Sequence, residues 1–121
     1  MSGRTTALLL AASFALGSGS GAQAADASKS PRGHEVFEKW CTPCHGRGAD
    51  KPGTVALATL YQGAKPAMLE ERTDLTPEIV KHFVRTGVTV MPFFRKTEIS
   101  DADLDALALY LSSPGASSTG G

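Results

Sequence analysis

The sequence predicts a small all-α domain, and three observations favour this fold class. Three segments carry apolar side chains at helical spacing, and each begins with a proline or a hydroxyl residue suited to cap a helix. No segment alternates apolar and polar residues as a half-buried strand does. The 121 residues are enough for one domain and few for two. We therefore expect helices over 31–40, 77–86 and 101–111.

The first 24 residues have the order of a secretory signal peptide. Arg4 supplies a positive start, residues 5–16 form a short apolar core, and residues 22–24 match an A-x-A cleavage site. We predict that residues 1–24 are removed and that the protein is periplasmic, the alternative being a retained N-terminal anchor. This core is too short to span a bilayer, and no later segment is apolar for that length. We expect no membrane span in the mature protein.

The charge of the mature chain argues against a nucleic-acid partner. Cleavage after Ala24 removes Arg4 and no acidic residue, which leaves eleven Lys and Arg against twelve Asp and Glu. A nearly neutral chain without a basic stripe lacks the electrostatic footprint of a nucleic-acid binder. A chain of this size is also small for a self-sufficient apolar core, so a large buried cofactor would help it to fold.

One side of the helix expected over 31–40 carries Val36, Phe37 and Trp40. Gly33 lies four positions before Phe37 on the same face, where another helix could approach closely. The alternative for this glycine is a simple N-terminal turn.

Glycine and proline interrupt the segment that follows. We expect residues 46–63 to form a loop, and a short helix near Pro66 to cover Met68 and Leu69.

The two later helices have clear start signals. Thr76 is suited to cap one helix, with Pro77 at its first position, and Gly87 is suited to end it. Ser100 is suited to cap the last helix, with acids in its first turn. Residues 113–121 are predicted as a disordered tail after a folded domain over 25–112. The buried faces are expected from Ile79, Val80, Phe83 and Val84, and from Leu104, Leu107, Ala108 and Leu111.

Both cysteines lie in Cys41-Thr42-Pro43-Cys44-His45, the C-x-x-C-H pattern of covalent haem attachment. Two thiols three positions apart on one helical turn can each form a thioether with a haem vinyl group, and the imidazole that follows can reach the iron. We predict one covalent haem c, bound through Cys41 and Cys44, with His45 as an axial ligand. The alternatives are a thioredoxin-like redox pair, a plain disulfide, and a zinc site, which normally needs four ligands.

The order of elements along the chain matches a known family. A helix with Gly33 and Phe37 precedes the C-x-x-C-H motif, and a Met-Pro loop precedes a final helix with Leu107 and Tyr110. In this order the chain resembles class I cytochromes c over essentially the whole mature domain. The resemblance implies a small all-α fold whose N- and C-terminal helices cross at nearly right angles around one covalently bound haem. Gly33 and Phe37 would there meet Leu107 and Tyr110.

The stretch from Leu75 to Leu111 narrows this resemblance. Its segments 75–78, 84–87, 90–92 and 108–111 are most similar to the cytochrome subunits of flavin-dependent 4-alkylphenol dehydrogenases, such as 4-cresol dehydrogenase (hydroxylating) and eugenol hydroxylase. The resemblance implies a flavoprotein dehydrogenase subunit as electron donor and a separate downstream electron acceptor.

The second axial ligand of the iron has four candidates: Met91, Met68, His34 and His82. Met91 stands in a loop that follows a helix and precedes a proline, which can present its sulfur to the haem, so we favour it. Its alternative is an ordinary packing methionine. Met68 is interpreted as packing and both histidines as surface residues, and an open iron site is the remaining possibility.

The resemblance also implies contacts around the haem. A loop proline carbonyl would accept the proton of the proximal imidazole, and Pro52 is the matching residue. The haem propionates could meet Tyr61, Arg72 or Arg95, among which the sequence does not choose. Apolar walls that exclude water are expected from Leu57, Val90, Phe93 and Phe94.

An iron with both axial positions filled passes single electrons and has no position for oxygen or substrate. The sequence therefore predicts a one-electron carrier rather than an enzyme, with no catalytic residue of its own. The alternatives are a free-standing shuttle cytochrome serving several partners, and a haem enzyme or gas sensor with an open iron site.

Overall fold

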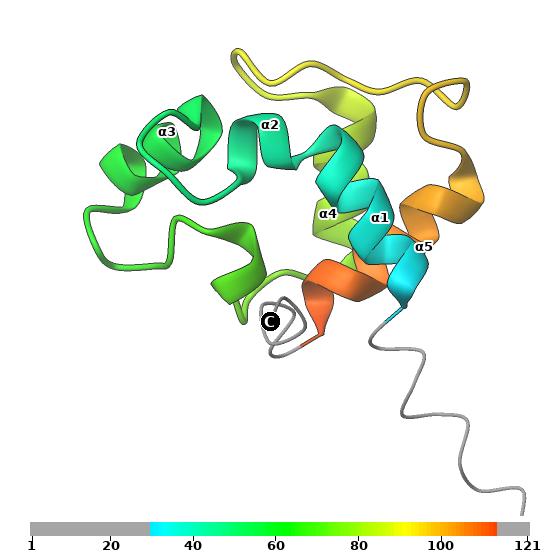
Figure 1. The fold of residues 1–121 in the computed structure, drawn as a ribbon, viewed down its shortest axis with the longest axis horizontal. Helices are drawn as coiled ribbons and strands as arrows, with labels where there is room; N and C mark the ends of the chain where they lie inside the picture. The colour runs from blue at the N-terminus through cyan, green and yellow to red at the C-terminus, as the bar shows by residue number, and fades with distance from the viewer. Residues whose placement is uncertain (1–29, 114–121) are drawn as a thin grey trace, which may run out of the picture.

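The computed structural model describes residues 30–113, and these residues form a small all-helical domain (Figure 1). Within this part of the chain no strand is formed, and the one β-type feature is an isolated bridge between Val88 and Met91. The predicted signal peptide over 1–24 and residues 114–121 of the predicted tail lie outside the described residues. The helices are α1 (Pro31–Trp40), α2 (Thr42–His45), α3 (Pro52–Tyr61), the 3-10 helix η2 (Leu69–Glu71), α4 (Pro77–Thr86) and α5 (Asp101–Ser112).

The first and last helices pack against each other, as the resemblance implies (Figure 1). Gly33 allows the contact, because a Cβ at this position would overlap the Ala106 carbonyl and the Tyr110 side chain. The rings of Phe37 and Tyr110 lie 6.0 Å apart between centroids. At the rim, Arg32 Nε donates to Asp103 Oδ1 at 2.7 Å and so adds an ion pair between α1 and α5.

The apolar core lies where α1, α4 and α5 meet. Phe37, Ile99 and Leu107 are its largest fully buried side chains. Burial of such side chains is the main favourable term in folding, at roughly 1.5–3 kcal/mol for each. The remaining members are Val36, Val80, Val84, Leu104, Ala108, Tyr110 and Leu111.

The start signals of the two later helices are confirmed. Thr76 Oγ1 accepts the Ile79 N–H at 3.3 Å, and Ser100 Oγ accepts the Asp103 N–H at 3.1 Å. Each bond satisfies a first-turn donor that has no partner within its own helix. Gly87 ends α4 with φ of 68°, a left-handed value that glycine adopts without strain.

Two sequence expectations between α2 and α4 are wrong. Residues 46–63 were expected to be loop, yet Pro52 opens α3 at the first helical position, where its missing N–H costs nothing. The apolar residues of α3 are spread around the helix and none of its residues is buried, so α3 lacks the one-sided apolar stripe by which helices are recognised. The helix expected to begin near Pro66 begins at Leu69 instead, and Met68 precedes it in extended backbone.

No helix within residues 30–113 is both long enough and apolar enough to cross a bilayer.

Candidate functional site

One helical turn brings the two cysteines and the histidine together. Cys41 ends α1, where its N–H donates to the Phe37 carbonyl at 2.8 Å. The Cys41 carbonyl then accepts the N–H groups of Cys44 at 3.0 Å and of His45 at 2.7 Å, which closes α2. Both thiols are free, with Cys41 half-buried and Cys44 exposed. The geometry therefore presents two separate thiols and an imidazole on one turn.

The Cys41 thiol differs from the thiols of redox enzymes. Burial, with a smaller contribution from Cys44, raises the pKa of Cys41 to about 12. Catalytic cysteines of C-x-x-C enzymes have lowered pKa values, because the thiolate is their nucleophile. The all-helical setting also lacks the βαβ surroundings of a thioredoxin-like motif. Neither observation supports the redox-pair alternative.

The environment of His45 favours the neutral form of its ring. Burial lowers the pKa of its imidazole, and its Nδ1 is buried without a hydrogen-bond partner among the described residues. A neutral imidazole is the form that coordinates metal ions. Gly53 lies against this ring, because a Cβ there would be 2.7 Å from His45 Cε1 and 2.9 Å from Nδ1.

The contact expected between His45 and the Pro52 carbonyl is not formed. Pro52 is the first residue of α3, where its carbonyl joins the first turn of the helix. The carbonyl is therefore directed along α3, and His45 Nδ1 receives no acceptor from the protein. The structure places the neighbouring Gly53 against the imidazole instead.

Met91 lies in the loop between α4 and α5, which doubles back on itself. Val88 and Met91 exchange two backbone hydrogen bonds, of 3.1 and 2.8 Å. Gly87 permits this return, since a Cβ there would lie 2.7 Å from the Met91 carbonyl oxygen. Met91 itself is half-buried.

An aromatic contact joins this loop to the cysteine motif. Phe94, three residues after Met91, packs edge-on against Trp40, with 5.8 Å between ring centroids. Trp40 directly precedes Cys41, so the structure brings the two candidate ligand segments to the same part of the molecule.

Of the other three candidate ligands, the two histidines have ring contacts within the protein. Met68 is the residue before η2. His34 packs on Tyr110 with centroids 5.5 Å apart and lies 3.7 Å from Glu38. His82 is exposed on α4 and packs edge-on against Phe83.

The structure separates the three candidates for the propionates. Arg72 Nη1 donates to the Tyr61 hydroxyl at 2.8 Å, and the guanidinium lies 4.9 Å from the centre of the Tyr61 ring. Arg72 is buried and also bonds both carboxylate oxygens of Asp74, at 2.6 and 2.8 Å. Arg95 is exposed and pairs with Glu98. Tyr61 and Arg72 thus form one cluster, to which Arg95 does not belong.

The expected apolar walls are only partly formed by the polypeptide. Leu57 and Phe94 are half-buried, whereas Val90 is 93% exposed and Phe93 60% exposed. Both exposed residues lie on the loop that carries Met91.

The residues of this site fit a covalently bound haem better than a zinc ion. No group of three or more His, Cys, Asp or Glu side chains that could hold a metal occurs within residues 30–113. A structural zinc ion takes four protein ligands, whereas an iron porphyrin brings four nitrogen ligands of its own. A porphyrin iron therefore needs few ligands from the protein. Two free thiols for covalent attachment and one imidazole for the iron, all on a single turn, match what a haem needs.

A comparison with known protein families decides between a haem site, a redox cysteine pair and a zinc site. Residues 28–111, more than half of the chain, match the family described as cytochrome c oxidase, cbb3-type, subunit III. The chain belongs to this family of cytochrome c domains. As a single cytochrome c domain, the protein carries one covalently bound haem c and is a haem electron carrier. The word oxidase in this description refers to the proteins after which the family is named, and not to this chain.

No curated protein and no solved structure gives a match to this cytochrome c domain. Membership of the family implies electron-transfer partners but does not name them.

Proposed function

We propose that this protein is a periplasmic mono-haem cytochrome whose haem is attached through Cys41 and Cys44, with His45 and Met91 as the axial ligands of the iron. The observation that carries the proposal is the contact between Trp40 and Phe94, because it brings the loop of Met91 to the end of α1. The bound haem would supply the one-electron redox chemistry.

The chain's own residues would decide that this haem carries electrons and does little else. An imidazole on one side and a thioether on the other leave no axial position for oxygen or substrate. A thioether also raises the reduction potential relative to a second histidine. The neutral form of His45, favoured by its burial, needs no deprotonation before it binds iron.

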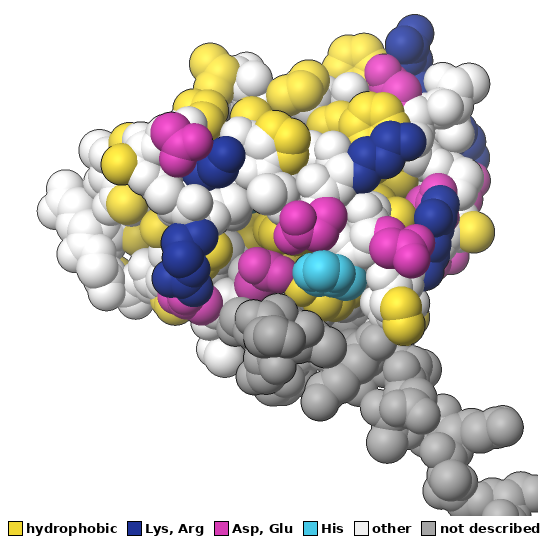
Figure 2. Space-filling model, in the orientation of Figure 1, with side chains coloured by type: hydrophobic (Ala, Val, Ile, Leu, Met, Phe, Trp, Pro, Cys, Tyr) yellow, Lys and Arg dark blue, Asp and Glu magenta, His cyan; other side chains and the backbone are white. Residues whose placement is uncertain are grey.

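The donor that we propose is a flavoprotein dehydrogenase of the 4-alkylphenol type, with a separate acceptor downstream. Support comes from the similarity of residues 75–111 to cytochrome subunits of such enzymes. The apolar residues Val88, Val90 and Phe93 are exposed on the loop beside Met91, and an exposed apolar group is typical of a surface that meets another protein. Figure 2 shows acidic and basic side chains interspersed on the face in view, without one dominant charge.

The axial assignment is tested by comparing Met91→Ala with Met68→Ala in the oxidised holoprotein. Sulfur ligation of ferric haem gives a weak absorption band near the red end of the visible spectrum. We expect Met91→Ala to abolish the band, lower the potential and admit exogenous ligands, while Met68→Ala retains the band. Loss of the band in Met68→Ala alone would show that Met91 is not the ligand. If neither change matters, a histidine or an open iron site replaces the assignment.

The attachment and the partner need separate measurements. We expect haem to remain on the chain after denaturation and acid-solvent extraction, and to be lost when Cys41 or Cys44 is replaced by Ser. Free haem in the extract of the unmodified protein would contradict covalent attachment. Co-purification with a flavin-containing subunit supports the dehydrogenase partner, whereas a monomer reduced equally by unrelated donors supports a free-standing shuttle.

A further inference from the structure

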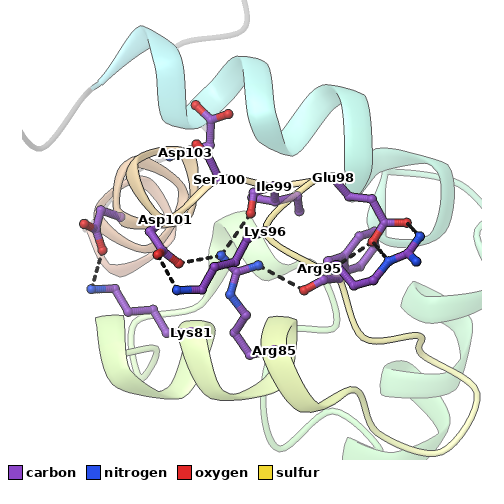
Figure 3. Close-up of polar contacts among 11 residues, drawn as sticks. Lys81, Arg85, Arg95, Lys96, Glu98, Ile99, Ser100, Asp101 and Asp103 are labelled. Atoms are coloured by element: carbon purple, nitrogen blue, oxygen red, sulfur yellow. Dashed lines mark hydrogen bonds and ion pairs between the residues drawn. The ribbon is translucent and has the colours of Figure 1, made fainter.

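One arginine ties the loop of Met91 to the rest of the domain. Arg85, in the last turn of α4, donates through Nη1 to the Phe94 carbonyl at 3.0 Å and through Nη2 to the Ile99 carbonyl at 2.9 Å (Figure 3). The Phe94 N–H donates to the Val84 carbonyl at 2.8 Å. The segment from Phe94 to Ile99 is thus fastened to α4 at both of its ends.

The guanidinium that makes these bonds is itself held in place. Arg85 Nη2 also donates to Asp101 Oδ1 at 2.9 Å, and Lys96 Nζ donates to Asp101 Oδ2 at 2.7 Å (Figure 3). The Arg85 side chain is only 24% exposed, and the Ile99 carbonyl that it binds belongs to a fully buried residue. A planar guanidinium with several fixed donors suits this geometry, in which three acceptors surround one side chain.

The Met91 side of the loop has no comparable fastening of its own. The two bonds between Val88 and Met91 are internal to the turn, so they fix its shape and not its position relative to the domain. Its exposed residues Val88, Val90 and Phe93 contribute little packing. The position of Met91 therefore depends on where the chain is held on either side of the turn: at the end of α4 and at Phe94.

We propose that Arg85 is a positioning residue for Met91, because its bonds to the Phe94 and Ile99 carbonyls hold the loop that keeps the thioether on the haem iron. The proposal rests on the proposed ligation by Met91. Without these bonds the two carbonyls can turn to water, and the loop can leave the iron more often. An outside ligand competes only with the open form, so its apparent affinity rises in proportion to the open fraction.

The chain offers a matched control on the same two helices. Lys81 lies one turn before Arg85 on α4 and pairs with Asp105 of α5 at 2.5 Å. Lys81→Gln removes one positive charge and one ion pair between α4 and α5, as Arg85→Gln does, but Lys81 is bonded to no carbonyl of the loop. Arg85→Lys keeps the charge and can keep the pair with Asp101, yet a single ammonium does not reproduce the planar fork that serves two carbonyls.

The experiment is a titration of the oxidised holoproteins with imidazole, followed by the loss of the sulfur-to-iron band. Hydrogen bonds from a charged donor contribute enough that we expect Arg85→Gln to bind imidazole about 10-fold more tightly than the unmodified protein. Arg85→Lys should also bind more tightly, and Lys81→Gln should match the unmodified protein. Equal affinities in Arg85→Gln and Lys81→Gln would overturn the proposal. If Arg85→Gln yields no holoprotein, Arg85→Lys against Lys81→Gln decides on the same criterion.

The same titration distinguishes failure of this inference from failure of the proposed ligation. A band that is present in the unmodified protein and lost in Met91→Ala, together with an unchanged Arg85→Gln, overturns the role of Arg85 alone. A band that is absent from the unmodified protein, or that survives in Met91→Ala, overturns both.

Discussion

Replacing Gly53 by Ala tests whether α3 constrains the proximal histidine. Gly53 is the second residue of α3, so alanine should favour the helix by at most about 1 kcal/mol, the preference found in helix interiors. The new Cβ, however, would lie 2.7 Å from His45 Cε1 and 2.9 Å from the Cys44 carbonyl oxygen, well inside contact distance. Overpacking of this kind typically costs about 1–3 kcal/mol. We expect a net destabilisation of about 1 kcal/mol, or a fall in Tm of roughly 4–8 °C for a domain of this size.

The assay is thermal unfolding of the oxidised holoprotein, followed by far-UV circular dichroism. Ala58→Gly, at an exposed position of the same helix, calibrates the propensity term, since only the helical preference changes there. The reduction potential of the haem gives a second readout, because displacing the His45 imidazole would change the ligation of the iron. If Gly53→Ala is more stable than the unmodified protein by the amount that Ala58→Gly loses, Gly53 places no constraint on His45 and the reasoning fails.

Three further outcomes follow from the core, the ion pairs and the cofactor. Leu107→Ala should lower the free energy of unfolding by about 2–5 kcal/mol, because Leu107 is fully buried. Leu109→Ala, on the exposed side of the same helix, should change it by less than about 0.5 kcal/mol. Arg72 and Lys65 hold the pKa of Asp74 well below its ordinary value. The ionised Asp74 therefore stabilises the fold fully at pH values above its ordinary pKa, and this stabilisation is lost as the pH falls through the lowered pKa. The Tm gap between the unmodified protein and Asp74→Asn should therefore be widest near neutral pH and close in acid, and a gap independent of pH would contradict this. Haem-free protein should show little helix by circular dichroism, since the haem completes a small core, and native-like helicity would refute that expectation.

The parts of the fold that could be predicted are those with strong local signals. The caps Thr76 and Ser100 act within one turn of sequence, and the buried residues of α1, α4 and α5 follow the helical period because one shared core buries them. On α4 the prediction is correct for Val80 and Val84. It is wrong for Ile79 and Phe83, which are 40% and 41% exposed. α3 escaped prediction because its apolar residues are spread around the helix and form no one-sided stripe. Pro52 did not decide the matter, because proline both opens helices and occurs in loops.

The candidate site also contains residues whose arrangement could be predicted from the sequence and residues whose arrangement could not. Cys41, Cys44 and His45 are adjacent in sequence, so a single turn dictates their arrangement. Gly53 and Arg85 act through tertiary contacts, which the sequence around them does not indicate. The bidentate pair of Arg72 with Asp74 was not predicted, although the two residues are only two positions apart in a loop rich in charge. The clustering of Arg72 with Tyr61, by contrast, depends on how η2 lies beside α3.

The packing of α1 on α5 also has a consequence for the order of events during biogenesis. Arg32 and Asp103, which pair across this contact, are 71 positions apart, so the contact closes a long loop and cannot form until the end of the chain is present. Closing a long loop costs conformational entropy, so contacts between such distant residues slow folding. Until the last helix is present, Cys41 therefore lacks its packing against a core that α5 completes. Under the proposed covalent attachment, the thiols would be most accessible to haem in that interval, which closure of the terminal helices would end.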